Sequence, residues 1–300
     1  MAVSSPFSVM IERIVAILFP VFVIPAIGYL VARHKKPDMA QTNRLIADVF
    51  VPALVFGALA DRSFHIAEFR WLALAMLLVT IACGALGFAL ARGLGVSHRV
   101  LVPPMMFSNS VNLGVPVAVL AFGDQALQPA IVLFLISSLL HYSYGLWLLD
   151  HQARISQMWR VPSLLAMIAG LVVSLAGIQV WQPAVVALRM LGDICIPLML
   201  FSLGVRMTDI SFKDWSVGAI SGLLRPAAGM LFSWGVADLL GLQGFEKGLL
   251  VIYGALPPAV MNYIFAERYD AEPDRVASIV LLGNLLSIAV LPVALYFALR

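Results

Sequence analysis

Long apolar runs recur along the whole chain and restrict what it can fold into. A transmembrane helix needs about 20 mostly apolar residues. Only 12% of the 300 residues are charged, against about 25% in a soluble domain. Because hydrocarbon offers the backbone no hydrogen-bonding partner, such runs cross a membrane as helices. We predict an all-α polytopic membrane protein whose ten spans cover residues 12–32, 40–60, 69–91, 100–121, 127–149, 161–178, 184–204, 215–238, 248–266 and 277–298.

Other classes of protein have no support in the sequence. The HExxH, GxSxG and glycine-rich phosphate-loop motifs are absent, so no enzyme is predicted. The net charge of +3 comes from basic residues in short loops and predicts no nucleic-acid partner. Cys83 and Cys195 lie in apolar runs without a CxxC or His-rich segment, so we expect packing roles for both, no metal and no cofactor.

Basic residues are distributed unevenly between the two sets of predicted loops. One set carries Arg33, Lys35, Lys36, Arg92, Arg99, Arg154, Arg160, Arg206, Lys213, Arg268 and Arg275, and the other carries Arg13, Arg62, Arg70, Lys247 and Arg300. Cytoplasmic loops are the richer in Lys and Arg. The first set is therefore predicted to be cytoplasmic and both termini outside, with residues 12–32 as a first transmembrane helix and not a signal peptide.

The two halves of the chain share a pattern at a constant offset. The segments "RLIADVFVPALVF" (44–56) and "RMLGDICIPLMLF" (189–201) align at an offset of 145 residues, and Asp124 is echoed by Asp270 at an offset of 146. Two five-helix halves, residues 1–150 and 151–300, would enter the membrane from opposite sides because five is odd. Inverted repeats of this kind occur in secondary transporters, which bind substrate near the membrane midplane.

Two predicted spans contain helix-breaking residues near their middle. These are "SNSVNLGVPVAV" (108–119), with Asn109, Asn112 and Pro116, and "LPPAVMNYIF" (256–265), with Pro257, Pro258 and Asn262. Proline removes a backbone donor, and non-helical backbone survives at this depth only when buried in protein or lining a cavity. Two such helices in matching positions favour a binding site built from half-helix ends and amides. The alternative is two proline kinks, with asparagines that join helices.

The repeated motifs also place charged residues inside the membrane. Arg44 precedes Asp48 by four residues, and Arg189 precedes Asp193 by four, so each pair lies on one helical face within reach of an ion pair. Intramembrane carboxylates usually face a cavity or a partner. Two interpretations stay open: carboxylates that couple transport to protons or other ions, and structural salt bridges.

Other polar residues within spans are weaker candidates. Arg225 has no carboxylate one turn away, so it is a candidate anion-binding residue, although it could instead pair with an aspartate of a neighbouring helix. Ser138 and Asn284 share the offset of 146 and are predicted to support the broken helices. His141, beside Ser137 and Tyr142, is a candidate proton relay or a helix-packing residue.

Several of these stretches resemble the auxin efflux carrier family. They are "NSVNLGVPVAVLAFG" (109–123), "GDICIPLMLFSLGV" (192–205), "GALPPAVMNYIFAERYDAE" (254–272) and "LLSIAVLPVAL" (285–295). The resemblance implies ten helices in two inverted repeats with a fold like that of bile acid:sodium symporters. Helices 1, 2, 6 and 7 would form a scaffold that can dimerise, and helices 3–5 and 8–10 a transport part. Helices 4 and 9 would cross at their breaks beside the substrate.

The resemblance also implies a function. A chain without the long central loop of many plant carriers resembles the compact bacterial members, which reside in the inner membrane and are linked to small mono- or dicarboxylates. We therefore expect a secondary transporter of a small organic anion, with H⁺ or Na⁺ as a candidate coupling ion. The alternatives are a Na⁺-coupled symporter of a larger organic anion and a membrane sensor that binds a ligand without moving it.

Overall fold

The computed structural model describes residues 6–61, 64, 66–151, 160–208 and 215–300. Within these ranges every named element is helical, and the only strand-like pairing is one isolated bridge. Arg62, Arg154 and Lys213, which contributed to the loop assignment, lie outside the described residues.

The first half of the chain contains two long helices and several shorter segments. Its elements are α1 (Pro6–Lys35), α2 (Ala40–Leu45), η1 (Ile46–Phe50), α3 (Val51–Leu59), η2 (Ile66–Phe69), α4 (Arg70–Leu94), α5 (His98–Met106), η3 (Ser110–Gly114), α6 (Val115–Phe122), η4 (Asp124–Ala126), α7 (Leu127–Leu140), η5 (His141–Gly145) and α8 (Leu146–Leu149). The segments η1, η3 and η5 are single π-helical turns.

The second half is built from longer and more regular helices. Its elements are α9 (Pro162–Leu175), α10 (Gln182–Arg206), α11 (Trp215–Leu240), α12 (Gly244–Ala255), α13 (Met261–Arg268) and α14 (Pro273–Ala298).

Six helical stretches of the described chain are long and apolar enough to cross a membrane. They are Ser8–Lys35, Ala40–Leu59, Ala67–Leu94, Asp124–Leu149, Gln182–Arg206 and Pro273–Ala298. Each coincides with a predicted span, so the prediction of a polytopic helical membrane protein is confirmed. The four other predicted ranges contain α5–α6, α9, α11 and α12–α13, and ten complete crossings in an inverted repeat stay a prediction.

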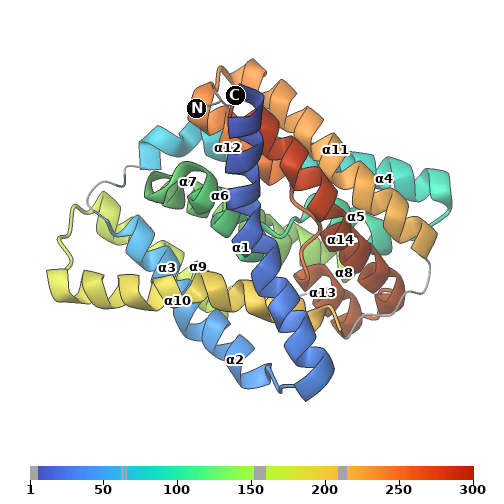
Figure 1. The fold of residues 1–300 in the computed structure, drawn as a ribbon, viewed down its shortest axis with the longest axis horizontal. Coiled ribbons are helices and arrows are strands. Elements are labelled where there is room, and N and C mark those ends of the chain that lie inside the picture. The colour runs from blue at the N-terminus through green and yellow to red at the C-terminus, as the bar shows by residue number, and fades with distance from the viewer. Residues whose placement is uncertain (1–5, 62–63, 65, 152–159, 209–214) are drawn as a thin grey trace.

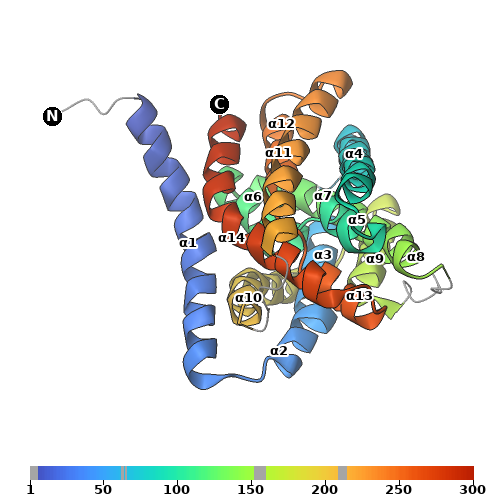
Figure 2. The ribbon, with the colours of Figure 1, turned by 90° about the vertical axis from the view of Figure 1, so that its right-hand side faces the viewer.

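The helices form two groups that pack mainly within themselves. In one group α1 packs across α10, and α3 packs on α9 and α10. In the other, α11 packs on α4, α12 and α14, while α4 packs on α5 and α7. Figure 2 shows α1 at the left of the molecule, α4 at the right, and α10 below α11 and α12. The start of α1 and the end of α14 lie at the same end of the molecule (Figures 1 and 2), as an even number of crossings requires.

Candidate functional site

Two interrupted helices cross at their breaks. α5 and α12 each end in a short extended segment, after which the chain continues as η3 and α13, and these two segments pair antiparallel. The backbone N–H of Asn109 donates to the carbonyl of Pro257 at 2.8 Å, and that of Ala259 donates to the carbonyl of Phe107 at 2.9 Å. Each break therefore gives the other the hydrogen-bond partners that non-helical backbone needs inside a membrane. We call these paired segments the crossover.

Three asparagine side chains hold the crossover together. The Nδ2 atom of Asn262 donates to the carbonyl of Phe107 at 3.0 Å, and that of Asn284 donates to the carbonyl of Pro258 at 3.1 Å. The Nδ2 atom of Asn109 donates to Oδ1 of Asn284 at 3.3 Å. All three residues are buried. Their amide donors are thus occupied by protein atoms, although Asn109 and Asn262 were predicted to bind substrate.

Arg225 also forms its hydrogen bonds with backbone atoms beside the crossover. It lies in α11, is 1% exposed, and its Nη1 atom donates to the carbonyl of Gly254 at 2.8 Å and to that of Leu256. Pro257 and Pro258 have no N–H, so carbonyls near the end of α12 need another donor. The guanidinium supplies one, and its charge is favourable at a helix C-terminus. Arg225 does not line the cavity described below, so the structure gives it a capping position and no contact with that space.

Close packing of glycines brings α11 to this position. A Cβ atom at Gly229 would overlap the carbonyl oxygen of Gly254, and one at Gly254 would overlap that of Gly229. Only two residues without side chains let α11 and α12 approach so closely. The approach places Arg225, one turn earlier in α11, beside the end of α12.

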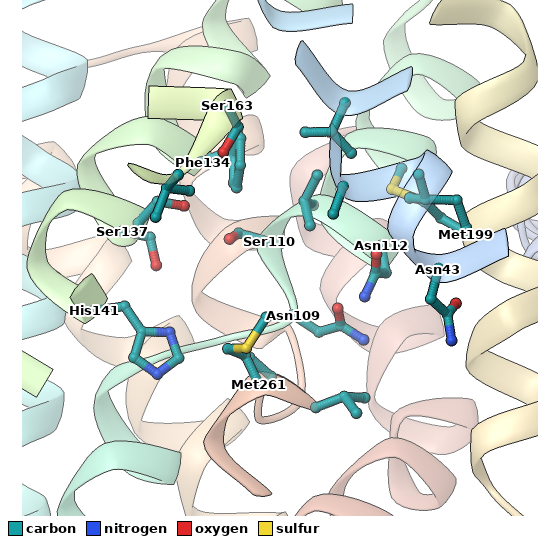
Figure 3. A pocket seen from close by; sticks show the side chains of 18 of the residues that line it. Asn43, Asn109, Ser110, Asn112, Phe134, Ser137, His141, Ser163, Met199 and Met261 are labelled. Carbon is teal, nitrogen blue, oxygen red and sulfur yellow. The ribbon is translucent and has the colours of Figure 1, made fainter. Parts of the chain in front are cut away.

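A cavity of about 340 Å³ lies beside the crossover. Its polar lining comes from α2, the extended segment after α5, η3, α7, η5, the start of α9 and α10. The polar residues are Asn43, Ser108, Asn109, Ser110, Asn112, Ser137, Ser138, His141, Tyr142, Arg160, Ser163, Ser202 and Arg206. Figure 3 shows Ser137 and His141 on one side of this space and Asn43 and Asn112 on the other. Within the described part of the chain, no carboxylate lines it. Its charged lining residues are both arginines, which suits an anionic guest.

Asn112 differs from the other asparagines of the breaks. It is half-buried on the cavity wall, and its amide forms no hydrogen bond with a described residue. The backbone N–H groups of Val111 and Asn112 also lack backbone acceptors among the described residues, because the first bonds of this turn run from Leu113 and Gly114 to the carbonyl of Asn109. Free N–H groups at a helix N-terminus, with its positive dipole end, attract anions.

Pro116 and Ser138, both predicted site residues, differ in whether they line the cavity. Pro116 is buried in α6, which continues the π-helical turn η3 without a break, so its missing N–H leaves one backbone acceptor of that turn without its helical donor. It does not line the cavity, whereas Ser138 does. Asn284, predicted as a supporting residue, contacts the crossover directly.

The two predicted ion pairs are absent from the described residues. Arg44, Asp48, Arg189 and Asp193 are all exposed, and no salt bridge joins either pair. In the first motif the π-helical turn η1 begins between Arg44 and Asp48, which changes the helical phase that would have aligned them. In the second motif both side chains line another cavity.

That other cavity has a volume of about 540 Å³ and lies between α3, the start of α7 and α10. Its charged residues are Asp61, Asp124, Arg189 and Asp193. It is therefore rich in carboxylates, in contrast to the cavity beside the crossover.

The sequence did not single out several cavity residues. Asn43 and Ser202 line the space and are hydrogen-bonded to each other, with Oγ donating to Oδ1. Both are polar residues inside apolar spans, and this feature of the sequence could have identified them as candidates. Neither has a polar counterpart 145 residues away, because the equivalent positions are Leu188 and Gly57.

Comparison with known proteins shows the family to which the chain belongs. The family model described as "Membrane transport protein" matches residues 13–159 and 154–295, which together cover nearly the whole chain. The chain belongs to the auxin efflux carrier family of membrane transport proteins. Family membership makes it a transporter and not an enzyme.

Its relatives come from archaea, bacteria and plants. The chain is 27% identical to an uncharacterized transporter of Methanothermobacter thermautotrophicus, over 91% of this chain and 94% of that one. It is 23% identical to a putative malonate transporter of Rhizobium meliloti, over 95% of each. Auxin efflux carrier component 6 of Arabidopsis thaliana is 28% identical over 44% of this chain and 24% of its own length.

Proposed function

We propose that this member of the auxin efflux carrier family is a secondary active transporter of a small mono- or dicarboxylate, which binds in the cavity beside the crossover. The observation that carries the proposal is the N-terminus of η3. There the amide of Asn112 and the backbone N–H groups of Val111 and Asn112 have no hydrogen-bonding partners among the described residues. These donors match the acceptor oxygens of a carboxylate.

The charge of the cavity supports an anion. Arg160 and Arg206 line it and no carboxylate of the described residues does, and basic lining groups raise the local concentration of anions. The names of two relatives, a putative malonate transporter and an auxin efflux carrier component, also support an anion, since malonate and auxin are both carboxylic acids. The function of those relatives supports the substrate class but does not identify the substrate of this chain.

The second cavity supports alternating access. Leu54, Gly57, Ala58 and Asp61 line it, and the residues 145 positions later, Met199, Ser202, Leu203 and Arg206, line the cavity beside the crossover. In an inverted repeat, equivalent residues face opposite sides of the membrane. The two cavities would then be the two access routes to the crossover. The packing of α1, α3, α9 and α10 apart from the other helices supports a scaffold against which a transport part moves.

The test is counterflow of ¹⁴C-malonate in proteoliposomes. Substitution of Asn112 by Ala removes one donor, and we expect at least a tenfold loss of uptake, since a hydrogen bond to a charged group contributes about 1.5–3 kcal/mol. Asn112→Asp should abolish uptake, because it places a carboxylate beside the bound anion. Gln41→Ala is the matched control: it removes an exposed amide that does not line the cavity.

Three outcomes separate the competing functions. Unchanged counterflow in both Asn112 variants would remove the crossover from substrate binding. Uptake that requires a Na⁺ gradient would favour a Na⁺-coupled symporter. Binding of malonate without counterflow would favour a membrane sensor.

A further inference from the structure

His141 is a buried imidazole on the cavity wall with aromatic rings on two sides. It begins η5, is 7% exposed and lines the cavity. Its ring stacks on Phe107 with centroids 4.1 Å apart and an angle of 12°, and the ring of Phe265 meets it at 5.0 Å and 73°. Aromatic faces stabilise a cation by about 0.5–2 kcal/mol. These rings therefore offset part of the free-energy cost of burying a charged imidazole, which burial alone disfavours.

The polar neighbour of the imidazole is the side chain of Asn262. The Nε2 atom of His141 and the Oδ1 atom of Asn262 are both buried, and neither makes a hydrogen bond of acceptable geometry with a described residue. The Nδ2 atom of Asn262 already donates to the carbonyl of Phe107, which fixes the amide so that its oxygen stays available. A proton on Nε2 would convert this unused pair into a charge-assisted hydrogen bond.

The described residues around His141 offer an imidazolium no carboxylate as a counter-anion. The titratable or charged groups that line the same space are Tyr142 on its own turn, Arg160 before α9 and Arg206 on α10. The break after α5 and the start of α13 face the ring with Phe107, Phe265 and Asn262, none of which titrates. Because none of these described groups is an anion, the described lining does not compensate a positive charge on the ring. A carboxylate bound in the cavity would supply the negative charge that stabilises a protonated ring.

We propose that His141 is the proton-coupling residue of this site: a carboxylate that enters the cavity draws one proton onto Nε2, and anion and proton cross together. The inference rests on the proposed function. A hydronium ion from the solution gives its proton to the lone pair of Nε2, so that one O–H bond breaks and one N–H bond forms, and the proton returns to water when the anion leaves. Moving an anion together with a proton transfers less net charge through the low-dielectric interior, which lowers the electrostatic cost of transport.

Calorimetry of the purified full-length protein tests this directly. Malonate is titrated into the protein at about pH 7.5 in two buffers that differ in ionisation enthalpy, and the difference in heat gives the number of protons taken up per bound anion. Because an unperturbed imidazole is mostly neutral above pH 6.5, we expect about one proton per malonate in the native protein. A value near zero in the native protein would overturn the inference without any variant.

Variants then assign the proton. His141→Gln keeps a polar side chain of similar length but cannot be protonated, so we expect the uptake to fall to near zero while malonate still binds within about tenfold. His141→Asn is a second, smaller test of the same loss. Tyr142→Phe, on the next residue of the cavity wall, is the matched control and should keep the native proton count.

The outcomes distinguish this inference from the proposed function. Proton uptake that persists in His141→Gln would place the proton on malonate or on another group and would overturn the role of His141. In proteoliposomes, a pH gradient should drive malonate accumulation by the native protein and not by His141→Gln, while counterflow continues in both. Failure of the native protein to bind malonate or any other carboxylate would instead remove the proposed function, and this inference with it.

Discussion

The asparagines of the two breaks differ in what their amides bind. Asn109 and Asn262 donate to protein atoms that close the crossover, whereas Asn112 faces the cavity without a partner among the described residues. A buried donor that already has an acceptor gains little from a ligand, and an unused one gains a hydrogen bond. The three residues look alike in the sequence. Only their surroundings in the fold distinguish the asparagines that hold the crossover from the one that is available to a ligand.

Arg225 gives a prediction at the same scale. Arg225→Met leaves the carbonyls of Gly254 and Leu256 buried without this donor, and each such loss costs about 1–3 kcal/mol. We expect a clear drop in melting temperature in detergent, a smaller drop for Arg225→Lys, and none for Arg92→Met at an exposed position. An unchanged melting temperature combined with weaker malonate binding would contradict the capping role and would indicate that Arg225 contacts the substrate.

At the scale of elements, the breaks were predictable and the π-helical turns were not. Proline and asparagine at 108–116 and 257–262 mark where the helices stop, because proline acts on its own backbone. The turns η1 and η5 contain neither proline nor asparagine, and the π-helical form of η3 inside the first break was not predicted, since an extra residue in a helical turn is stabilised by what packs around it. Both ion pairs were inferred from an ideal helix, and η1 removes that geometry for Arg44 and Asp48.

The approach of α11 to α12 can be tested with a pair of glycines in one helix. Gly229→Ala places a Cβ atom against the carbonyl oxygen of Gly254, and backbone must move to relieve it, so we expect destabilisation of about 1–3 kcal/mol and loss of transport. Gly235→Ala, also in α11, meets no atom within 4 Å. It should leave stability unchanged or raise it by up to about 1 kcal/mol, because alanine is the better helix former. Equal effects of the two changes would contradict the tight contact.

For the whole molecule, the predicted orientation can be read with a membrane-impermeant maleimide. The native Cys83 and Cys195 are fully buried, so the native protein should stay unlabelled and serve as the background. If the Lys- and Arg-rich loops are cytoplasmic, Gln243→Cys should react in intact right-side-out spheroplasts. Lys35→Cys should react only after permeabilisation. The reverse pattern would place both termini in the cytoplasm and exchange the sides of the two cavities.

The sequence by itself determined the class of the protein, its family and the location of the two breaks. Each of these follows from local composition or from residues that act on their own backbone. Only the tertiary structure decided which polar side chains remain available for a ligand. The partners of Asn262, Asn284 and Arg225 come from segments up to 155 residues away, and hydrogen bonds between such distant segments form only when the helices pack. That packing occupies Asn109 and Asn262, caps α12 with Arg225, and leaves Asn112 and His141 facing the cavity.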